Sequence, residues 1–324
     1  MRNENSKKVS IIIPVYNVEK YLAKCLETVI LNKTEEVEIL LINDGATDNS
    51  ESICKNFLEK DRRIRYFSRE NKGCSSTRNF GIKESRGEYI WFIDSDDYIE
   101  ENAIEEILEE LKKNEVELLI FGYSIIKNGK SLKGHTPNNI NDKNDIYKKD
   151  EIFNKPWNKI YSSKILKENN LLFPENCHMG EDMAFNFKYL YFIQKIKEIQ
   201  KPLYNYVVTN GAMSNINKRK EIFFAFDDVF DFYARKEEDL KNLKQVLKKY
   251  YKKHAILFPY EMILNSSLSK KEKEGKINEL NKELNRRKNM FGTQFLYKQL
   301  YYYLKYKFYF LKPYYNKIKK GENL

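Results

Sequence analysis

The sequence lacks several features that would assign it to common classes. It has no apolar run approaching the ~18 residues of a membrane-spanning helix. Its charged N-terminus is followed only by the short run Val9–Pro14, so we expect no signal peptide. Its four cysteines form no Cys-x-x-Cys pair, and no histidine lies at metal-ligand spacing from them. These absences argue against a zinc site and are typical of a reducing compartment, so we expect a cytoplasmic protein.

Phosphate-binding loops and nucleic-acid motifs are also missing. The chain contains neither the G-x-G-x-x-G of dinucleotide-binding folds nor the G-K-[ST] of P-loop proteins. It contains no recognisable RNA- or DNA-binding motif, so we expect no nucleic-acid partner.

The composition is that of a basic globular protein. Among 324 residues, 41% are hydrophobic and 32% charged, and the formal net charge is +11. This length suits a catalytic domain with an appendage. The basic surplus suits anionic partners such as nucleotides, phospholipids or acidic polymers, without choosing among them.

The first third of the chain alternates short apolar runs with segments of helical spacing. Asp48 and Glu51 are predicted to form a capping box, and residues 129–149 a long polar loop. From about residue 218 the pattern is helical. The alternation predicts an α/β fold with a doubly wound, mostly parallel sheet and a helical C-terminal extension. We expect strands at 9–13, 37–42, 64–67, 89–93 and 117–123, and helices at 18–30, 48–60, 75–85 and 101–114.

Polar and acidic segments follow three of the expected strands. They are Pro14–Asn17, Asn43–Asp48 and Asp94–Asp97. Because ligands bind beyond the carboxyl ends of parallel strands, these segments should meet at one rim of the sheet. Clustered carboxylates are costly unless a cation or hydrogen-bond donors balance them. An all-oxygen cluster suits Mg²⁺ or Mn²⁺ held together with substrate phosphates.

Four motifs, in order and with compatible spacing, closely resemble those of the family 2 glycosyltransferases, which have the GT-A fold. The resemblance covers roughly residues 8–210. In place of the usual Asp-Asp-Gly-Ser, the second motif carries Asn43 and Ala46, which leaves the base preference less defined. The four motifs read VSIIIPVYN (9–17), LINDGATD (41–48), NKG with RNFG (71–73 and 78–81) and FIDSDD (92–97).

The resemblance implies a nucleotide-binding role for five residues. Pro14 and Tyr16 match the loop under the base and ribose. Asp44 matches the carboxylate that hydrogen-bonds the base, usually uracil. Arg78 matches a basic residue near the nucleotide, and Asp94 an acid near the ribose and diphosphate.

The resemblance also implies a metal ligand and a general base. Asp96 matches the ligand of the D-x-D motif, which implies Mn²⁺ or Mg²⁺ as cofactor. The segment Met179–Phe185 resembles the Glu-Asp motif that precedes a helix, so Asp182 is the expected base and Glu181 its support in orienting the acceptor. Taken alone, two acids at a helix start are better explained as a capping pair that the helix dipole favours; the upstream motifs reverse this preference.

A second acceptor-side segment consists of Trp157, Asn158 and Lys159, which resemble the family's Asn-Lys segment beside the acceptor site. The alternative interpretation is a core tryptophan next to a surface lysine.

The C-terminal tail predicts a membrane-surface helix. Residues 291–320 contain no acid, and Leu296, Leu300, Leu304, Phe308 and Leu311 form one helical stripe. Lysines 298, 305 and 312 lie opposite that stripe. A basic amphipathic helix of this kind fits an anionic membrane surface, although docking on the catalytic domain is an alternative.

These features together predict an inverting glycosyltransferase, a hexosyl- or N-acetylhexosaminyl-transferase, acting at the inner face of a membrane. It would move a sugar from a nucleotide-diphosphate donor, a UDP-sugar, to a saccharide or lipid-linked acceptor in cell-surface glycan synthesis. We expect a catalytic domain at 1–215 (nucleotide half 8–100, acceptor half 101–215), a helical region at 216–290 and the tail at 291–324. The alternatives are a nucleotidyltransferase on a similar fold and a non-catalytic protein that binds membranes or polyanions.

Overall fold

A computed structural model of the chain describes residues 7–137, 140, 145–146, 154–177, 179–208, 222–235, 251, 263 and 269–286. The chain consists of two compact units. One comprises residues 1–213 and 227–235, and the other residues 214–226 and 236–324. All the motifs named above belong to the first unit. The functional division of the chain at residues 215 and 290 stays a prediction.

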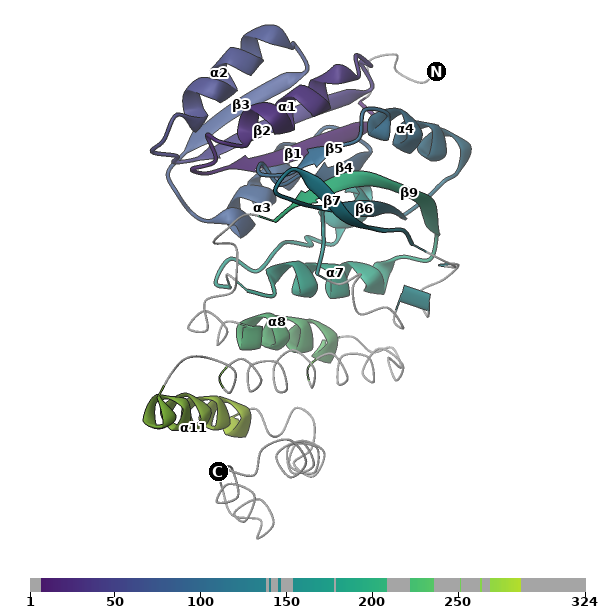
Figure 1. Cartoon of the computed structure of the whole chain (residues 1–324). Coiled ribbons are helices and arrows are strands. Elements are labelled where there is room, and N and C mark those ends of the chain that lie inside the picture. Colours follow the sequence, from purple (N-terminus) through teal and green to yellow (C-terminus); the bar gives the residue numbers. More distant parts are fainter. Residues whose placement is uncertain are drawn as a thin grey trace. The chain divides into compact units, whose positions relative to one another are not determined.

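The described part of the first unit is built on one mixed sheet with the strand order β3-β2-β1-β4-β8-β6-β9-β5, and β7 pairs with β6 (Figure 1). Neighbours within β3-β2-β1-β4 are parallel, as are β6 and β9. The ladders of β8, β5 and β7 are antiparallel. The strands are β1 (Val9–Val15), β2 (Val37–Asp44), β3 (Ile64–Arg69), β4 (Tyr89–Phe92), β5 (Tyr98–Ile99), β6 (Leu118–Lys127), β7 (Lys130–His135), β8 (Lys159–Ser162) and β9 (Ile196–Val207). The predicted α/β fold with a mostly parallel sheet is confirmed.

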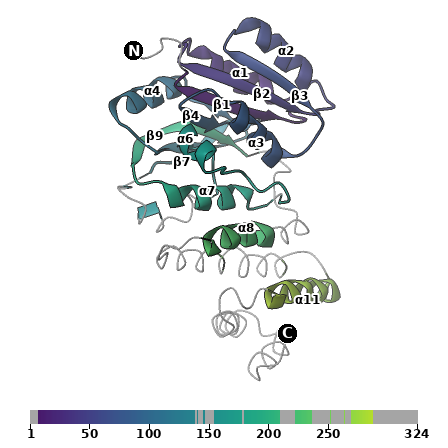
Figure 2. The same ribbon diagram turned by 180° about the vertical axis from the view of Figure 1, so that it is seen from behind.

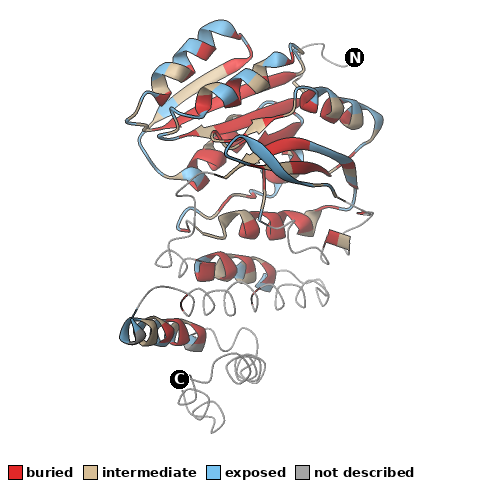
Figure 3. Cartoon of the chain, in the orientation of Figure 1, coloured by how far each residue is buried: buried red, intermediate tan, exposed pale blue. Residues whose placement is uncertain are grey.

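Helices cover both faces of the sheet (Figures 1 and 2). Side chains of α1, α2 and α4 share one apolar cluster with alternate residues of β1 and β2, whereas α3 and α6 pack on the other face. Because both faces are covered, β2 is buried along its whole length (Figure 3). The helices are α1 (Leu22–Leu31), α2 (Ser50–Lys60), α3 (Cys74–Glu84), α4 (Ala103–Lys113), α6 (Ser163–Glu168), α7 (Glu181–Phe192), α8 (Ile222–Ala234) and α11 (Lys270–Arg286).

A proline in the central strand β1 is tolerated because the neighbouring ladder has already ended. Pro14 has no N–H to give to a ladder. The pairing of β1 with β4 stops at Ile12 and Phe92, so no hydrogen bond to β4 is lost at Pro14. The strands separate at this point, which opens the rim where the polar segments begin.

The packing of α3 on the sheet depends on a glycine. A Cβ atom on Gly81 would lie 2.5 Å from Cγ2 of Ile12 and 3.0 Å from Cδ1 of Ile42. The bare backbone therefore lets α3 lie close against β1 and β2. Arg78 lies three residues earlier on the same helix. The close packing of α3 on the sheet therefore also determines how far Arg78 lies from the sheet.

Two local predictions were wrong. The expected loop at 129–149 begins with strand β7, which forms a hairpin with β6 through Asn128 and Gly129, both at positive φ. Such a two-residue turn matches the twist of the paired strands. Asp48 and Glu51 form no capping box. Asp48 instead accepts from the backbone N–H of Glu19 at 2.9 Å, tying two loops together, and Glu51 pairs with Lys55.

In the second unit, the described residues include α11, which starts with a true capping box. Ser269 Oγ accepts from the N–H of Glu272 at 3.4 Å, and the carboxylate of Glu272 accepts from the N–H of Ser269 at 2.8 Å. Within the part of the chain that the structure describes, no helix is both long and apolar enough to span a membrane. The predicted amphipathic tail at 291–324 lies outside the described residues.

Candidate active site

The loops that follow β1 and β2 are joined at the rim of the sheet. Asn17, at φ 50°, accepts the N–H of Thr47 through its side-chain oxygen at 2.8 Å. Gly45 turns the second loop at φ 72°, and a Cβ there would lie 2.9 Å from the backbone nitrogen of Asn71. Only glycine combines this positive φ with so close an approach. The Asp-Gly pair of the second motif is therefore a steric requirement of the rim.

Asp44 fixes the loop that leads into α3. Its buried carboxylate accepts the N–H of Lys72 at 3.1 Å and the N–H of Gly73 at 2.8 Å, and Nε of Arg69 lies 3.3 Å away. These bonds hold the chain immediately before Cys74, where α3 begins. Asp44 thus positions the helix that carries the central arginine, and the base contact implied by the resemblance stays a prediction.

Arg78 joins two carboxylates from distant parts of the chain. Its Nη2 donates to Oδ1 of Asp94 at 2.7 Å, and its Nη1 donates to Oδ1 of Asp182 at 2.8 Å. The arginine side chain is only 5% exposed, while those of Asp94 and Asp182 retain 27% and 24%. Its guanidinium stacks 5.2 Å from the ring centre of Phe173, and its Nε has no hydrogen-bond partner among the described residues. One buried cation therefore holds the end of β4 against the start of α7.

The electrostatics of this cluster favour a protonated carboxyl. Burial, assisted by the charges of Glu181 and Asp94, raises the pKa of Asp182 to about 8, although the Arg78 guanidinium acts in the opposite direction. A carboxyl with a pKa near neutrality can take up and release a proton under ordinary conditions, as a general base must.

The loop after β4 carries a second acidic group. Burial and the charge of Asp94 raise the pKa of Asp96 to about 6, and burial with both neighbouring carboxylates also raises the pKa of Asp97. Asp97 accepts from the hydroxyl of Tyr204 and from the N–H of Val207, both at 2.7 Å. The Tyr204 hydroxyl also accepts the N–H of Asp94 at 3.1 Å. Strand β9 thus fixes the shape of the whole acidic loop.

The predicted acceptor-side residues lie in the interior. Trp157 is buried and stacks on Tyr204 with ring centres 4.5 Å apart. Asn158 donates to a backbone carbonyl of β6 at 3.2 Å. Lys159 is buried, not a surface residue, and donates to Oδ1 of Asn158 at 2.8 Å. Burial and the charge of Lys155 lower the pKa of Lys159, while Asp182 opposes that shift.

The residues present fit a divalent cation bound together with a diphosphate. Among the described residues, no three acidic, histidine or cysteine side chains converge as a ready ligand set. Mg²⁺ and Mn²⁺ sites of this kind need only one or two carboxylates, with substrate phosphates and water completing the shell. Burial first and the neighbouring carboxylates second raise the pKa values of Asp96 and Asp97, so ionised carboxylates in this loop would be stabilised by a bound cation. Asp96, with Asp94 beside it, would hold the cation.

The structure brings together some of the predicted site residues but not all. Arg78, Asp94 and Asp182 are in direct contact, and Asp96 lies within their electrostatic reach. Tyr16 is 48% exposed, and no contact among the described residues joins it to this cluster. Sequence reasoning missed Tyr204, because nothing in an alternating strand distinguishes a tyrosine that bonds the acidic loop from one that only packs.

Comparison with known proteins identifies the class. The sequence model of "Glycosyl transferase family 2" matches residues 10–177, and the chain belongs to this family. It is 32% identical over 223 residues to "Glycosyltransferase GlyA" of Streptococcus pneumoniae serotype 4, covering 64% of this chain and 32% of that protein. It is 30% identical over 247 residues to "Poly(ribitol-phosphate) beta-glucosyltransferase" of Bacillus spizizenii, covering 74% of this chain and 38% of that protein. The chain thus spans less than half the length of both relatives.

The fold has a close match among solved structures. S. aureus TarS 1-349 in complex with UDP-GlcNAc superposes with a TM-score of 0.69 at 20% identity, over 88% of this chain and 83% of that one. This similarity confirms the GT-A fold predicted from the motifs. The residue roles remain predictions of the sequence and the geometry.

Proposed function

We propose that the chain transfers a hexosyl or N-acetylhexosaminyl group from a UDP-sugar to a saccharide or lipid-linked acceptor, with inversion, in cell-surface glycan synthesis. The observation that carries this proposal is the Arg78 bridge, because one guanidinium contacts both the donor-side acid Asp94 and the candidate base Asp182. This contact supports a single site in which the donor lies beside the candidate base. The relative crystallised with UDP-GlcNAc supports a UDP-sugar donor.

The donor would lie on the rim formed by the first two loops. Tyr16, half-exposed in the first loop, would offer a ring for the base, and Asp44 holds the loop before α3. Arg78, Asp94 and Asp96 would meet the ribose and diphosphate. A divalent cation, when bound, would offset the charge that develops on the departing diphosphate.

The acceptor hydroxyl needs a base, because a neutral hydroxyl is a weak nucleophile. Asp182 is the candidate, since its pKa is raised to about 8 and it stands at the first turn of α7. A single carboxylate that takes the proton while the diphosphate leaves from the opposite side of the anomeric carbon gives one displacement, and hence inversion. Holding donor and acceptor in line supplies much of the rate.

The proposed function is tested through the Asp96→Asn variant. Incubation with a panel of UDP-sugars and Mn²⁺ should release UDP from the wild-type protein. The variant should be slower by roughly a hundredfold at a fixed Mn²⁺ concentration, because one anionic ligand is lost. Its half-maximal Mn²⁺ concentration should also rise. Equal UDP release by both proteins across all donors would refute the enzymatic proposal.

We also propose that residues 291–324 hold the chain at the inner face of a membrane containing anionic lipid, as their basic amphipathic pattern predicts. The full chain should sediment with phosphatidylglycerol-containing liposomes, and a chain truncated after residue 290 should not. Added salt should weaken the binding, because surface electrostatics are screened. Equal sedimentation of both chains would contradict this role.

A further inference from the structure

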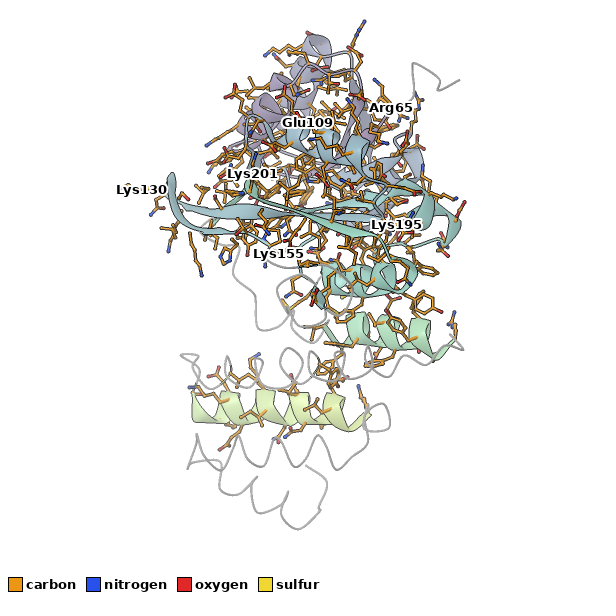
Figure 4. The ribbon with its side chains drawn as sticks, turned by 90° about the vertical axis from the view of Figure 1, so that its right-hand side faces the viewer. Arg65, Glu109, Lys130, Lys155, Lys195 and Lys201 are labelled. Carbon is orange, nitrogen blue, oxygen red and sulfur yellow. The ribbon has the colours of Figure 1, made fainter. Side chains whose placement is uncertain are left out.

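The β6–β7 hairpin is a basic surface, and its lysines have no acidic ion-pair partner in the part of the chain that the structure describes. Between Lys127 and His135 it carries three lysines and no acid. Lys127, Lys130 and Lys133 are all exposed, and none of them forms an ion pair with another residue that the structure describes. Lys130 lies at the far tip of the hairpin (Figure 4). The other exposed strand position of note is Leu132, which is 61% exposed.

The arrangement of these charges is unfavourable for the isolated protein. Lys127 and Lys130 are directly opposite each other across the turn, and like charges in that position destabilise a hairpin. Asn128 and Gly129 both hold positive φ, as a two-residue hairpin turn requires, and this turn keeps the backbones of Lys127 and Lys130 opposite each other. A negatively charged partner would remove the repulsion.

The hairpin is connected to the acidic cluster by a continuous series of rings. His135 stacks on Tyr123 at 4.7 Å between ring centres, Tyr123 meets Trp157 edge-on at 4.9 Å, and Trp157 stacks on Tyr204 at 4.5 Å. Tyr204 donates to Asp97. The ammonium of Lys155 lies 5.2 Å from the ring centre of Tyr123. These contacts run without interruption from His135 on the hairpin to Asp97 in the acidic loop, which also carries Asp96.

We propose that the β6–β7 hairpin binds the anionic chain of the acceptor, a polymer with phosphodiester charges, while the polymer's hydroxyl reaches the base at Asp182. This inference rests on the proposed function and names its acceptor class. The lysines of the hairpin are complementary in charge to such a polymer, and they lie outside the acidic cluster that the donor diphosphate and its cation would occupy. Lysines that form no ion pair with another described residue, at the end of a projecting hairpin, attract such a chain from solution and hold it near the site.

The test uses two full-length variants that lose the same charge. In the hairpin variant, Lys127, Lys130 and Lys133 are changed to glutamine. In the control variant, Lys33, Lys83 and Lys164 are changed to glutamine. These three lysines are also exposed, and none of them forms an ion pair with another described residue. The probe is a fluorescently labelled oligomer of glycerol phosphate, with a neutral dextran of similar length as reference, and binding is followed by anisotropy.

The hairpin variant should lose about tenfold in affinity for the glycerol phosphate oligomer, and the control variant less than twofold. Affinity of the wild type should fall with added salt, and dextran binding should not change among the three proteins. Equal losses in both variants would overturn the proposal, because net charge alone would then explain them. Loss of binding to phosphatidylglycerol vesicles without loss of oligomer binding would overturn it in favour of a membrane contact.

The lysines could instead protect an edge strand from pairing with other chains. Light scattering distinguishes this role, since self-association of the hairpin variant with unchanged oligomer affinity would overturn the proposal. UDP release from the donor without acceptor reports the proposed function separately. That release should be equal in all three proteins, so a failure of the hairpin inference is distinguishable from a failure of the enzyme assignment.

Discussion

Replacing Asp182 by asparagine is expected to slow sugar transfer by roughly a thousandfold, the usual effect of removing a general base. Asparagine keeps the side-chain oxygen that accepts from Nη1 of Arg78, so the geometry of the cluster should persist. Donor affinity, measured by titration calorimetry with the UDP-sugar, should stay within about threefold of the wild type. The measurement that decides is the rate of product formation at saturating donor.

The pH dependence provides a second readout for the same residue. A base must be ionised to accept a proton, and burial raises the pKa of Asp182 to about 8. The wild-type kcat/KM should therefore rise as the pH increases towards 8 and level off above it. A flat profile between pH 6 and 9 would contradict the assignment.

The stability of the variant separates a catalytic loss from a folding defect. A carboxyl whose pKa is raised by folding binds protons more tightly in the folded chain, so ionising it lowers stability as the pH rises from about 4 towards 8. Asparagine removes this decrease, so the Asp182→Asn variant should melt no lower than the wild type at pH 8. The control is Glu51→Gln, an exposed carboxylate paired with Lys55, which should change neither rate nor stability appreciably.

Replacing Arg78 by leucine is expected to have the largest effect on stability. The guanidinium is nearly inaccessible and neutralises both Asp94 and Asp182. Its removal leaves two carboxylates without their cation, which costs about 2–4 kcal/mol of unfolding free energy, reduced from the fully buried case by their partial exposure. Denaturant unfolding at pH 8 measures this loss. Activity of the folded fraction should fall by at least a hundredfold, because donor loop and base are no longer held together.

Two comparisons make the Arg78 prediction specific. Arg63 forms a similarly buried pair with Asp61, 2.7 Å between Nη2 and Oδ2, outside the acidic cluster. An Arg63→Leu variant should lose comparable stability but keep the specific activity of its folded fraction. The destabilisation caused by Arg78→Leu should also shrink at pH 6, where protonation relieves the unpaired carboxylates. A loss that does not change with pH would rule out this electrostatic explanation.

Hydrophobic periodicity predicted the first strands of the sheet better than it predicted the exposed hairpin strand, and better than residue spacing predicted the helix cap. The runs at 9–13, 37–42 and 64–67 became β1, β2 and β3. The signal is strongest for β1 and β2, because strands buried on both faces require continuous apolar residues. The hairpin strand β7 was missed because it is exposed along most of its length and carries no apolar alternation. The pair Asp48 and Glu51 had the correct spacing for a capping box, but Asp48 accepts from the backbone N–H groups of Ser50 and Glu19, and Glu51 pairs with Lys55.

The sequence by itself determined the family and the alternation of strands and helices up to about residue 123, because its motifs and hydrophobic periods are local properties of the chain. It also named the acids and the arginine of the cluster. Only the tertiary structure decided that Arg78 contacts Asp94 and Asp182 at once, across 16 and 104 residues of chain, and that Tyr204 fixes the acidic loop. The physical reason is that contacts between distant residues, and the burial that shifts their pKa values, exist only once the helices have packed on the sheet.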